Sequence, residues 1–292
     1  MTPVRIKMSK ITVENVSYVY SAGTPFEVKA LDDINLSIEE NRITGIIGHT
    51  GSGKSTLVQM FNGLVRPDEG RILLDGADIW ENPKEIGKVR FKVGLVMQYP
   101  EYQLFEETVK ADIAFGPKNM GLDEDEIKNR VGECAGFVGL GQNELDKSPF
   151  DLSGGQKRRA AIAGVMAMKP EVLVLDEPAA GLDPAGRASI FDGIVKYKNS
   201  TGAAVIIVSH SMEDMAKYCD YLIVMADAKV FMTGDRDTVF SNSSQLENIG
   251  LDIPQITKVM TLLCEAGVNV SKSIYTVEDA ERALLKLFGG VR

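Results

Sequence analysis

The stretch ITGIIGHTGSGKST (residues 43–56) decides the fold of this chain. It begins with a short, nearly continuous apolar run (43–48), which is typical of a buried strand in a parallel sheet. A glycine-rich loop follows, and then an amphipathic pattern (54–64) that predicts a helix. Strand, loop and helix in this order carry the pattern G-x-x-x-x-G-K-[ST], which predicts a phosphate-binding loop.

The residue types of this loop suit the binding of phosphate groups. Its glycines allow backbone N–H groups to curve around an anion without Cβ clashes, and the helix N-terminus adds a partial positive charge. Lys54 would supply a full charge to the β- and γ-phosphates, and the Ser55 hydroxyl would bind Mg²⁺. His49 occupies a variable position of the pattern and has no predicted catalytic role. The predicted nucleotide-binding residues of the loop are Gly48, His49, Thr50, Gly51, Ser52, Gly53, Lys54, Ser55 and Thr56.

Further apolar runs alternate with helical patterns along the rest of the chain. This alternation predicts an α/β core around a parallel sheet. Nearer the N-terminus, two segments alternate in hydrophobicity as half-buried strands do. The apolar runs are residues 91–96, 171–177, 203–210 and 221–225, and the alternating segments are residues 10–20 and 27–38.

Three polar side chains stand where two of these buried runs end. Asp176 and Glu177 close the run 171–177, and His210 closes the run 203–210. Open α/β sheets bind ligands at the carboxyl ends of their strands, so we expect all three beside the phosphate loop. Asp176 then suits a Mg²⁺ position, Glu177 a general base for the attacking water, and His210 a sensor of the γ-phosphate.

The composition limits the classes of function. A chain of 292 residues fits one large domain or a core domain with an appendage, and the formal charge of −9 argues against binding to nucleic acid or to anionic lipid. Three widely spaced cysteines indicate neither a disulfide framework nor a zinc site, and they fit a reducing cytosol. We expect neither a signal peptide nor a membrane-spanning segment, so a membrane role would need a partner.

The segment MQYPEYQLF (97–105) is unusual because aromatic side chains directly follow a predicted buried strand. Tyr99, Tyr102 and Phe105 fit three different settings, namely the core, a nucleotide pocket or a docking surface for another protein. The pattern by itself leaves these alternatives open.

The segment LSGGQ (152–156) combines a helix start with two glycines. Ser153 and Gln156 have the spacing of a capping box, which predicts a helix N-terminus. Gly154 and Gly155 cost helix stability relative to alanine, so a cap alone does not explain them. Their benefit would be a helix N-terminus whose backbone N–H groups are open to an anion. The sequence thus predicts a second anion site.

From about residue 10 to 235 the motifs of the chain occur in the order found in ATP-binding-cassette (ABC) ATPases, which the chain therefore resembles. These motifs are the phosphate loop, Gln98, LSGGQ, VLVLDE (172–177), GLDP (181–184) and His210. The resemblance implies a P-loop NTPase fold: a RecA-like core with an antiparallel β subdomain and an inserted helical subdomain. It also implies that two subunits sandwich two ATP molecules head to tail. The LSGGQ helix of one subunit would then cap the γ-phosphate held by the other.

The resemblance assigns further roles by position. Tyr20 would stack on adenine, with an ordinary strand residue as the alternative, and the choice of ATP over GTP rests on the resemblance. Gln98 would reach Mg²⁺ and the attacking water, Asp183 would lie at the subunit contact, and residues 153–156 would face the partner's ATP. Ala179 departs from the family pattern, which usually has Thr or Ser after Glu-Pro.

Three longer segments narrow the resemblance to the energy-coupling factor (ECF) transporter ATPases, which power uptake of vitamins and transition-metal ions, and among them to the second (A-prime) type. These segments are residues 48–64, 98–122 and 180–184. The resemblance implies ATP and Mg²⁺ as cofactors and a location at the cytoplasmic face of the membrane. It implies three partners: a companion ATPase (or a second copy of this chain), a transmembrane coupling protein and a membrane substrate-binding protein.

Two other functions stay open at this point. One is the ATPase of another ABC importer, and the other is a cassette ATPase without a transport role, such as an iron–sulfur assembly subunit. A P-loop kinase or GTPase is disfavoured, because neither needs LSGGQ and the chain has no NKxD guanine motif.

We expect an ABC ATPase domain over residues 1–240, with the helical subdomain inserted at about 99–168. Residues 241–292 would form a C-terminal extension for dimerisation or regulation, beginning with a polar linker (241–250) and an amphipathic helix around 256–263. That helix would contact the companion subunit or pack back onto the cassette. The resemblance also places Tyr102 and Phe105 at the coupling protein, so we expect both to be partly exposed.

Overall fold

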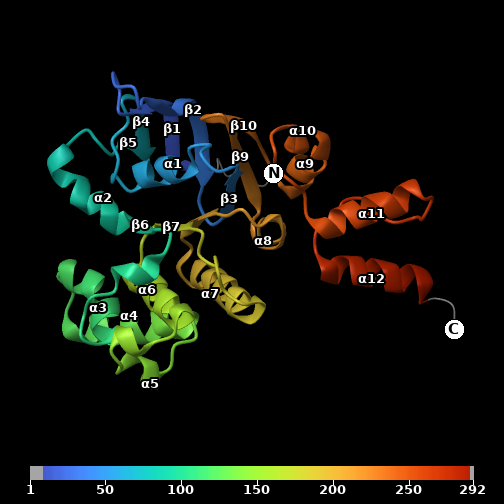
Figure 1. Cartoon of the computed structure of the whole chain (residues 1–292). Coiled ribbons are helices and arrows are strands. Elements are labelled where there is room, and N and C mark those ends of the chain that lie inside the picture. Colours follow the sequence, from blue (N-terminus) through green and yellow to red (C-terminus); the bar gives the residue numbers. More distant parts are fainter. Residues whose placement is uncertain (1–8, 290–292) are drawn as a thin grey trace, which may run out of the picture.

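The computed structural model of the protein describes residues 9–289. Its centre is a six-stranded sheet in the order β10-β9-β3-β8-β7-β6 (Figure 1). Five strands are parallel, and β10 adds an antiparallel edge. Every residue of β3, β7 and β8 is buried, as expected for strands with both faces covered. The strands are β3 (Ile43–Gly48), β6 (Val93–Val96), β7 (Val172–Asp176), β8 (Ala204–Val208), β9 (Tyr221–Ala226) and β10 (Lys229–Gly234).

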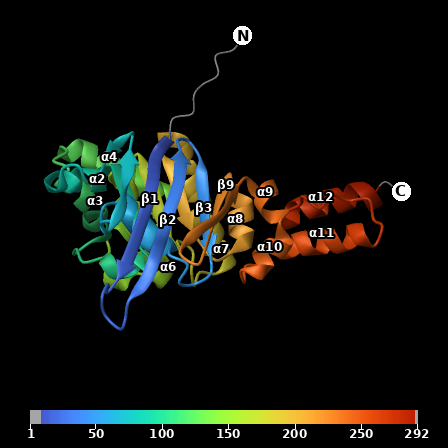
Figure 2. The same ribbon diagram turned by 90° about the horizontal axis from the view of Figure 1, so that it is seen from above.

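A second sheet of four antiparallel strands lies beside the central one. Its order is β2-β1-β4-β5, and the long strands β1 and β2 run side by side in Figure 2. Apolar residues of β1 and β2 share one hydrophobic core with helix α1 and with one face of the central sheet. This shared core fixes the end of β1, and with it Tyr20, against the phosphate loop. The elements are β1 (Ser9–Tyr20), β2 (Val28–Glu39), β4 (Glu69–Leu74), β5 (Ala77–Asp78) and α1 (Lys54–Phe61).

Four helices form a lobe below the central sheet in Figure 1. They are α3 (Val109–Asn119), α4 (Glu124–Phe137), α5 (Gln142–Leu145) and α6 (Gly154–Ala167). Side-chain caps mark the starts of three of them, because Thr108, Asp123 and Ser153 each accept a hydrogen bond from a backbone N–H of the first turn. The predicted α/β class is confirmed, whereas the domain boundaries, including the helical subdomain at about 99–168, stay a prediction.

The segment 91–96 differs from the prediction at its start. Phe91 and Lys92 are the last residues of helix α2 (Ile86–Lys92), and the strand β6 begins only at Val93. The sequence is apolar on both sides of this boundary for different reasons. Phe91 lines a surface groove, whereas the residues from Val93 onward enter the sheet. A short apolar run does not distinguish these two settings.

Four helices form most of the C-terminal part from residue 236 to 288, and the predicted polar linker over 241–250 is wrong. That segment contains helix α10 (Ser243–Asn248), in which Leu246 is fully buried. Around it lie α9 (Arg236–Phe240), α11 (Gln255–Glu265) and α12 (Val277–Phe288). Two isolated apolar residues in ten gave no periodic signal, although one of them anchors the segment in the core.

Helices α11 and α12 lie side by side and project from the body as an arm (Figures 1 and 2). They enclose a small core of their own around Met260, Ile274 and Ala280. The arm is tied to helix α8 (Met212–Tyr218) by an ion pair between Lys217 Nζ and Glu278 Oε1 at 3.1 Å. The predicted helix over 256–263 is confirmed, and it packs on its own partner helix rather than flat on the cassette.

The arm should depend on Met260 for its stability. Met260 is fully buried, and its replacement by alanine leaves a cavity that costs about 2–5 kcal/mol. We expect Met260→Ala to accelerate amide hydrogen exchange in α11 and α12 while the central sheet stays protected. Val259→Ala on the same helix removes a side chain that is 47% exposed, and it should change exchange little. Equal protection of the arm in both variants would contradict this account of its core.

Candidate functional site

The phosphate loop joins β3 to α1, and two of its glycines stand where no side chain fits. A Cβ atom on Gly48 would lie 2.3 Å from the carbonyl oxygen of Met225. Gly53 has φ of 97°, and a Cβ atom there would lie 2.3 Å from the carbonyl oxygen of Ala30. Both positions therefore require glycine, and the loop is packed closely against β9 and β2.

Lys54 is buried inside the loop, with only 6% of its surface exposed. Its Nζ donates hydrogen bonds to the carbonyl oxygens of Gly48, at 2.7 Å, and His49, at 2.8 Å. Burial lowers the pKa of this ammonium group, and the nearby carboxylates of Glu177 and Asp176 raise it in part. An anion in the loop would thus meet a charge that is held in place and only weakly solvated.

Oxygen atoms that could donate to a metal ion come from three segments around the start of α1. The Ser55 hydroxyl hydrogen-bonds to the carboxylate of Asp176, and Gln98 lines the same cavity. Burial raises the pKa of Asp176, while the Ser55 hydrogen bond and the charge of Lys54 lower it in part. These donors are the ligand type that Mg²⁺ prefers. Among residues 9–289 no group of three or more His, Cys, Asp and Glu side chains is placed to hold a metal ion.

Glu177 holds the least satisfied carboxylate of the site. Its Oε1 is buried and accepts no hydrogen bond, while its Oε2 accepts one from the Ser209 hydroxyl at 3.4 Å. Burial, followed by the charge of Asp176, raises its pKa. The backbone of Glu177 has φ of 51°, a strained conformation for a residue with a side chain. A buried oxygen with a free lone pair and a raised pKa suits a group that accepts a proton.

His210 lies on the other side of Glu177, with its Nε2 3.5 Å from Glu177 Oε1. Burial lowers the pKa of the imidazole, the charge of Lys54 lowers it further, and Asp176 raises it in part. The lowered pKa favours the neutral imidazole, which can both donate and accept a hydrogen bond. The three side chains predicted at the strand ends do meet beside the phosphate loop.

Tyr20 closes the cavity at the end of β1. Its Oη lies 3.3 Å from Thr56 Oγ1, and its ring packs edge-on against Tyr18 with centroids 4.8 Å apart. Tyr20 is 40% exposed. Val28 and Ala30 line the cavity next to it.

These residues enclose a cavity of about 320 Å³. That volume lies within the usual range of small-ligand sites. Sequence reasoning missed four contributors. Val28, Ala30 and Val208 line the cavity, and Ser209 donates to Glu177. They carry no motif signal, because their contribution comes from their place in the sheets.

Residues 153–156 and Asp183 stand apart from this cavity. Ser153 Oγ accepts a hydrogen bond from the Gln156 backbone N–H at 3.3 Å, and Gln156 Oε1 accepts one from the Ser153 N–H at 3.0 Å. The predicted capping box is thus confirmed, and Ser153 and Gly154 face solvent. Asp183 is exposed at the N-terminus of α7 (Pro184–Thr201). Within one chain, LSGGQ does not touch the phosphate loop's cavity.

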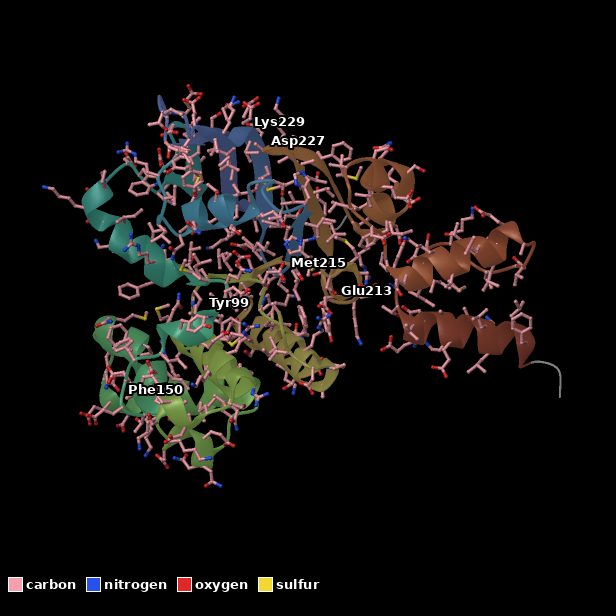
Figure 3. The ribbon with its side chains drawn as sticks, in the orientation of Figure 1. Tyr99, Phe150, Glu213, Met215, Asp227 and Lys229 are labelled. Carbon is pink, nitrogen blue, oxygen red and sulfur yellow. The ribbon has the colours of Figure 1, made fainter. Side chains whose placement is uncertain are left out.

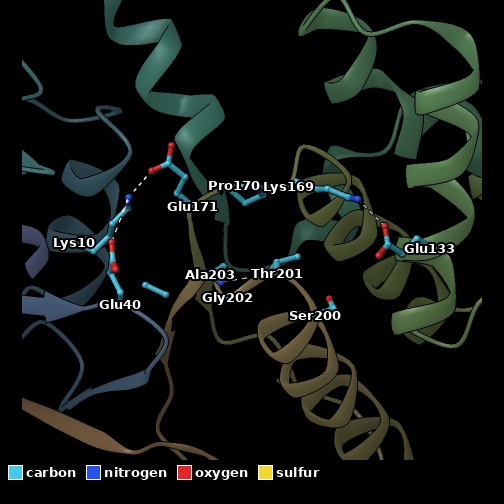
Figure 4. Close-up of a pocket in the computed structure, with 11 residues that line it drawn as sticks. Lys10, Glu40, Glu133, Lys169, Pro170, Glu171, Ser200, Thr201, Gly202 and Ala203 are labelled. Atoms are coloured by element: carbon cyan, nitrogen blue, oxygen red, sulfur yellow. Dashed lines mark hydrogen bonds and ion pairs between the residues drawn. The ribbon is translucent and has the colours of Figure 1, made fainter. Parts of the chain in front are cut away.

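A larger hollow of about 460 Å³ lies at the opposite end of the strands (Figure 4). Its charged side chains pair with one another: Lys10 with Glu40 and Glu171, and Lys169 with Glu133. No residue lining this hollow has a buried side-chain oxygen without a hydrogen bond, as Glu177 has. The chemistry therefore favours the smaller cavity at the phosphate loop.

The β9–β10 turn borders the phosphate loop. Figure 3 labels Asp227, in this turn, and Lys229, the first residue of β10, and Asp227 Oδ1 lies 3.8 Å from His49 Nε2. Asp227 and Ala228 both have positive φ, at 48° and 62°. His49 thus faces the turn, and its Nδ1 lies 2.9 Å from the Thr50 carbonyl oxygen. This geometry fits its predicted lack of a catalytic role.

The fold and the site are those of a P-loop nucleoside triphosphatase. Residues 31–180 match the model of the ABC transporter family. The energy-coupling factor transporter ATP-binding protein EcfA2 of Clostridium acetobutylicum is 52% identical over 278 residues, which cover 95% of this chain and 97% of the relative. The protein of that name from Caldanaerobacter subterraneus is 50% identical over 97% of this chain and 99% of its own length.

Solved structures agree with these relatives. Clostridium perfringens CbiO1, described as part of the ABC transporter complex CbiONQ, has a TM-score of 0.74 at 40% identity, over 87% of this chain and all of CbiO1. The ATP-binding cassette MJ0796, solved as a dimer with ADP and Pi, has a TM-score of 0.70 at 28% identity, over 77% of this chain and 98% of its own. The chain belongs to the ABC transporter family, among the ATP-binding proteins of energy-coupling factor transporters.

The raised pKa of Glu177 has a measurable effect on stability. A carboxyl group whose pKa is raised by folding favours the folded state below its ordinary pKa and opposes folding as pH rises through the raised value. Glutamine does not ionise. We therefore expect Glu177→Gln, without nucleotide, to melt about 1–4 °C above the unsubstituted protein at neutral pH. Thermal unfolding followed by circular dichroism measures this difference, which should vanish below about pH 4. A lower melting temperature at neutral pH would contradict the burial cost assigned to Glu177.

Proposed function

We propose that this chain binds Mg²⁺-ATP in the phosphate-loop cavity and hydrolyses it to power uptake of a vitamin or a transition-metal ion through membrane partners. The observation that carries the hydrolytic part is the buried Oε1 of Glu177, which accepts no hydrogen bond, in the same cavity as the buried ammonium of Lys54. The names of the EcfA2 relatives, which cover nearly the whole chain, support the transport part.

The proposed roles follow from the geometry. The loop N–H groups and Lys54 bind the phosphates, and the partly exposed Tyr20 stacks on adenine. Glu177 orients the attacking water and takes its proton on Oε1, while His210 donates a hydrogen bond to the γ-phosphate. Bound Mg²⁺, held by Ser55, Asp176 and Gln98, would stabilise negative charge on the phosphates.

The site within one chain is incomplete for hydrolysis. No LSGGQ residue lines the cavity. Helix α6, which has 14 residues, begins at the surface and has two glycines in its first turn. We infer that residues 153–156 cap the γ-phosphate in a partner subunit and that Asp183 lies at the same contact. The dimeric MJ0796 cassette supports pairing of this kind.

The arm supports a companion subunit as well. Val259, Leu262, Leu285 and Phe288 on α11 and α12 are 47–64% exposed. An apolar stripe on two paired helices is typical of an interaction site rather than a solvated face. We propose that it holds the companion ATPase, or a second copy of this chain.

A surface groove supports docking of the membrane coupling protein. The segment 97–105 leaves the sheet at the junction with the helical lobe, where Figure 3 labels Tyr99. A hollow of about 320 Å³ lies there, lined by Phe91, Phe105 and Phe115 among others. Tyr102 is 84% and Phe105 58% exposed, which confirms the predicted exposure. No helix among residues 9–289 is long and apolar enough to cross a membrane. We propose that the chain binds the cytoplasmic face through this groove.

The base assignment is tested by Glu177→Gln in the intact assembly, purified through a tag on this chain. Loss of a general base lowers turnover about 10²–10⁴-fold, whereas a neutral isostere leaves the phosphate contacts in place. We expect ATP binding to stay within about twofold of the unsubstituted protein. Unchanged hydrolysis would show that Glu177 is not the base.

The docking assignment is tested by Tyr102→Glu and Phe105→Glu. A charge in an apolar contact is costly, so we expect both variants to lose their integral membrane partners in a pull-down from native membranes and to keep ATP binding. Phe26→Glu is the matched control, since Phe26 is 81% exposed but lies on the β1–β2 turn. If the variants at 102 and 105 recover as much membrane protein as the control, this groove is not the docking site. Recovery of no integral membrane protein by the unsubstituted chain would overturn the transport role itself.

A further inference from the structure

Arg158 is the most deeply buried ion-paired side chain of the helical lobe, with 4% of its side chain exposed. It lies on α6, two residues after the last residue of LSGGQ. Its Nε donates to Glu101 Oε2 at 3.1 Å and its Nη2 to Glu101 Oε1 at 2.9 Å. Its Nη1 donates to the carbonyl oxygen of Ala180. One guanidinium thus joins three segments that are far apart in sequence.

Each of the two acceptors lies three residues after a proposed catalytic side chain. Glu101 follows Gln98 and lies in the single helical turn Pro100–Gln103. Ala180 follows Glu177, and its backbone N–H donates to the Glu177 carbonyl oxygen at 3.3 Å. The same stretch leads directly into Asp183 at the start of α7.

The conformations held by this contact are strained. Glu177 has φ of 51°, and Tyr99, between Gln98 and Glu101, has φ of 57°. Non-glycine residues keep such angles only where surrounding contacts fix them. The Arg158 contacts lie just beyond both strained residues, so they are placed to hold the two turns in this shape.

A second arginine provides a comparison within the same lobe. Arg130 Nε donates to Glu126 at 2.6 Å, and its Nη1 donates to the carbonyl oxygens of Ala167 and Met168 at 3.4 and 3.2 Å. Its side chain is 15% exposed. The chemistry resembles that of Arg158, but Glu126 lies on α4, the two carbonyl acceptors lie at the far end of α6, and none of the three belongs to a motif of the site.

We propose that Arg158 is a positioning residue that holds Gln98, Glu177 and the LSGGQ helix in one arrangement. This inference rests on the proposed function. Gln98 and Glu177 act on the nucleotide of their own chain, and LSGGQ acts on the nucleotide of the partner. If either catalytic segment shifts, its contact with Arg158 therefore moves the LSGGQ helix, which caps the second nucleotide.

The geometry requires the planar fork of arginine. Lysine offers a point charge, so it can pair with Glu101 but cannot donate two parallel hydrogen bonds and a third to the Ala180 carbonyl. Arg158→Lys keeps the charge inside the lobe and removes the three-way contact. It therefore separates positioning from simple charge neutralisation.

The test uses the assembly purified through a tag on this chain. We expect Arg158→Lys to lower kcat for ATP hydrolysis about 10–100-fold, the scale expected when catalytic groups are displaced by about 1 Å. The KM for ATP, and the affinity of the full chain for a fluorescent ATP analogue, should stay within about twofold, because Arg158 touches neither the phosphate loop nor Tyr20. Arg130→Lys should leave kcat within about twofold.

Several results would overturn the proposal. They are an unchanged kcat for Arg158→Lys, an equal fall in kcat for Arg130→Lys, and a loss of ATP affinity that accounts for the fall.

A second variant is used if Arg158→Lys melts well below the control Arg130→Lys. The double variant Glu101→Gln with Arg158→Gln removes both charges and keeps hydrogen-bonding groups. That variant should recover the melting temperature and keep a low kcat, and a recovered kcat would refute the positioning role.

Failure of the proposed function gives a different result. In that case the unsubstituted assembly would not hydrolyse ATP, or Glu177→Gln would hydrolyse it at the same rate. The effect of Arg158 is judged only against an unsubstituted assembly that hydrolyses ATP.

Discussion

The buried ammonium of Lys54 is the interaction on which the site depends. Its hydrogen bonds to the carbonyl oxygens of Gly48 and His49 hold the loop closed around a space that suits an anion. The loop keeps this shape because its two crowded glycines press against β2 and β9. Burial lowers the pKa of Lys54 and raises those of Asp176 and Glu177, since all three charges share a poorly solvated space. A bound phosphate would supply a negatively charged partner for Lys54, and Mg²⁺ would supply a positively charged partner for the carboxylates.

The molecule divides its functional groups between two faces. The groups proposed to bind and hydrolyse a nucleotide line one cavity, whereas Ser153, Gly154 and Asp183 are exposed. On the proposed function, two subunits complete each other's sites, so hydrolysis would be conditional on their approach. Arg158 then links the two faces within one chain. The groove near Phe105 adds a third surface, placed on the same short segment as Gln98. In this way one stretch of nine residues would connect a membrane partner to the chemistry.

Much of this could be predicted from the sequence, and the parts that could not share a physical reason. The phosphate loop, the Asp176–Glu177 pair and His210 follow from local patterns at strand ends, and the structure brings them together as expected. Helix α10 was missed because a single buried residue, Leu246, anchors it. The strand β10 was missed because it lies at the edge of the sheet and none of its residues before Gly234 is buried, so it lacks the apolar run of the buried strands. Ser209 and the Glu101–Arg158 pair act through tertiary contacts across 32 and 57 residues, which no local pattern encodes.

The phosphate loop with Lys54 should contribute more to the affinity for a nucleotide than the contacts to its adenine base do. The most direct test of this expectation is the affinity of the full chain for Mg²⁺-ATP and for adenosine, measured by calorimetry before and after Lys54→Ala. The account predicts that this substitution weakens ATP binding by about 100-fold or more, the equivalent of about 3 kcal/mol for a lost charge-assisted contact, and leaves adenosine binding unchanged. Equal ATP affinity in a correctly folded Lys54→Ala protein would contradict it.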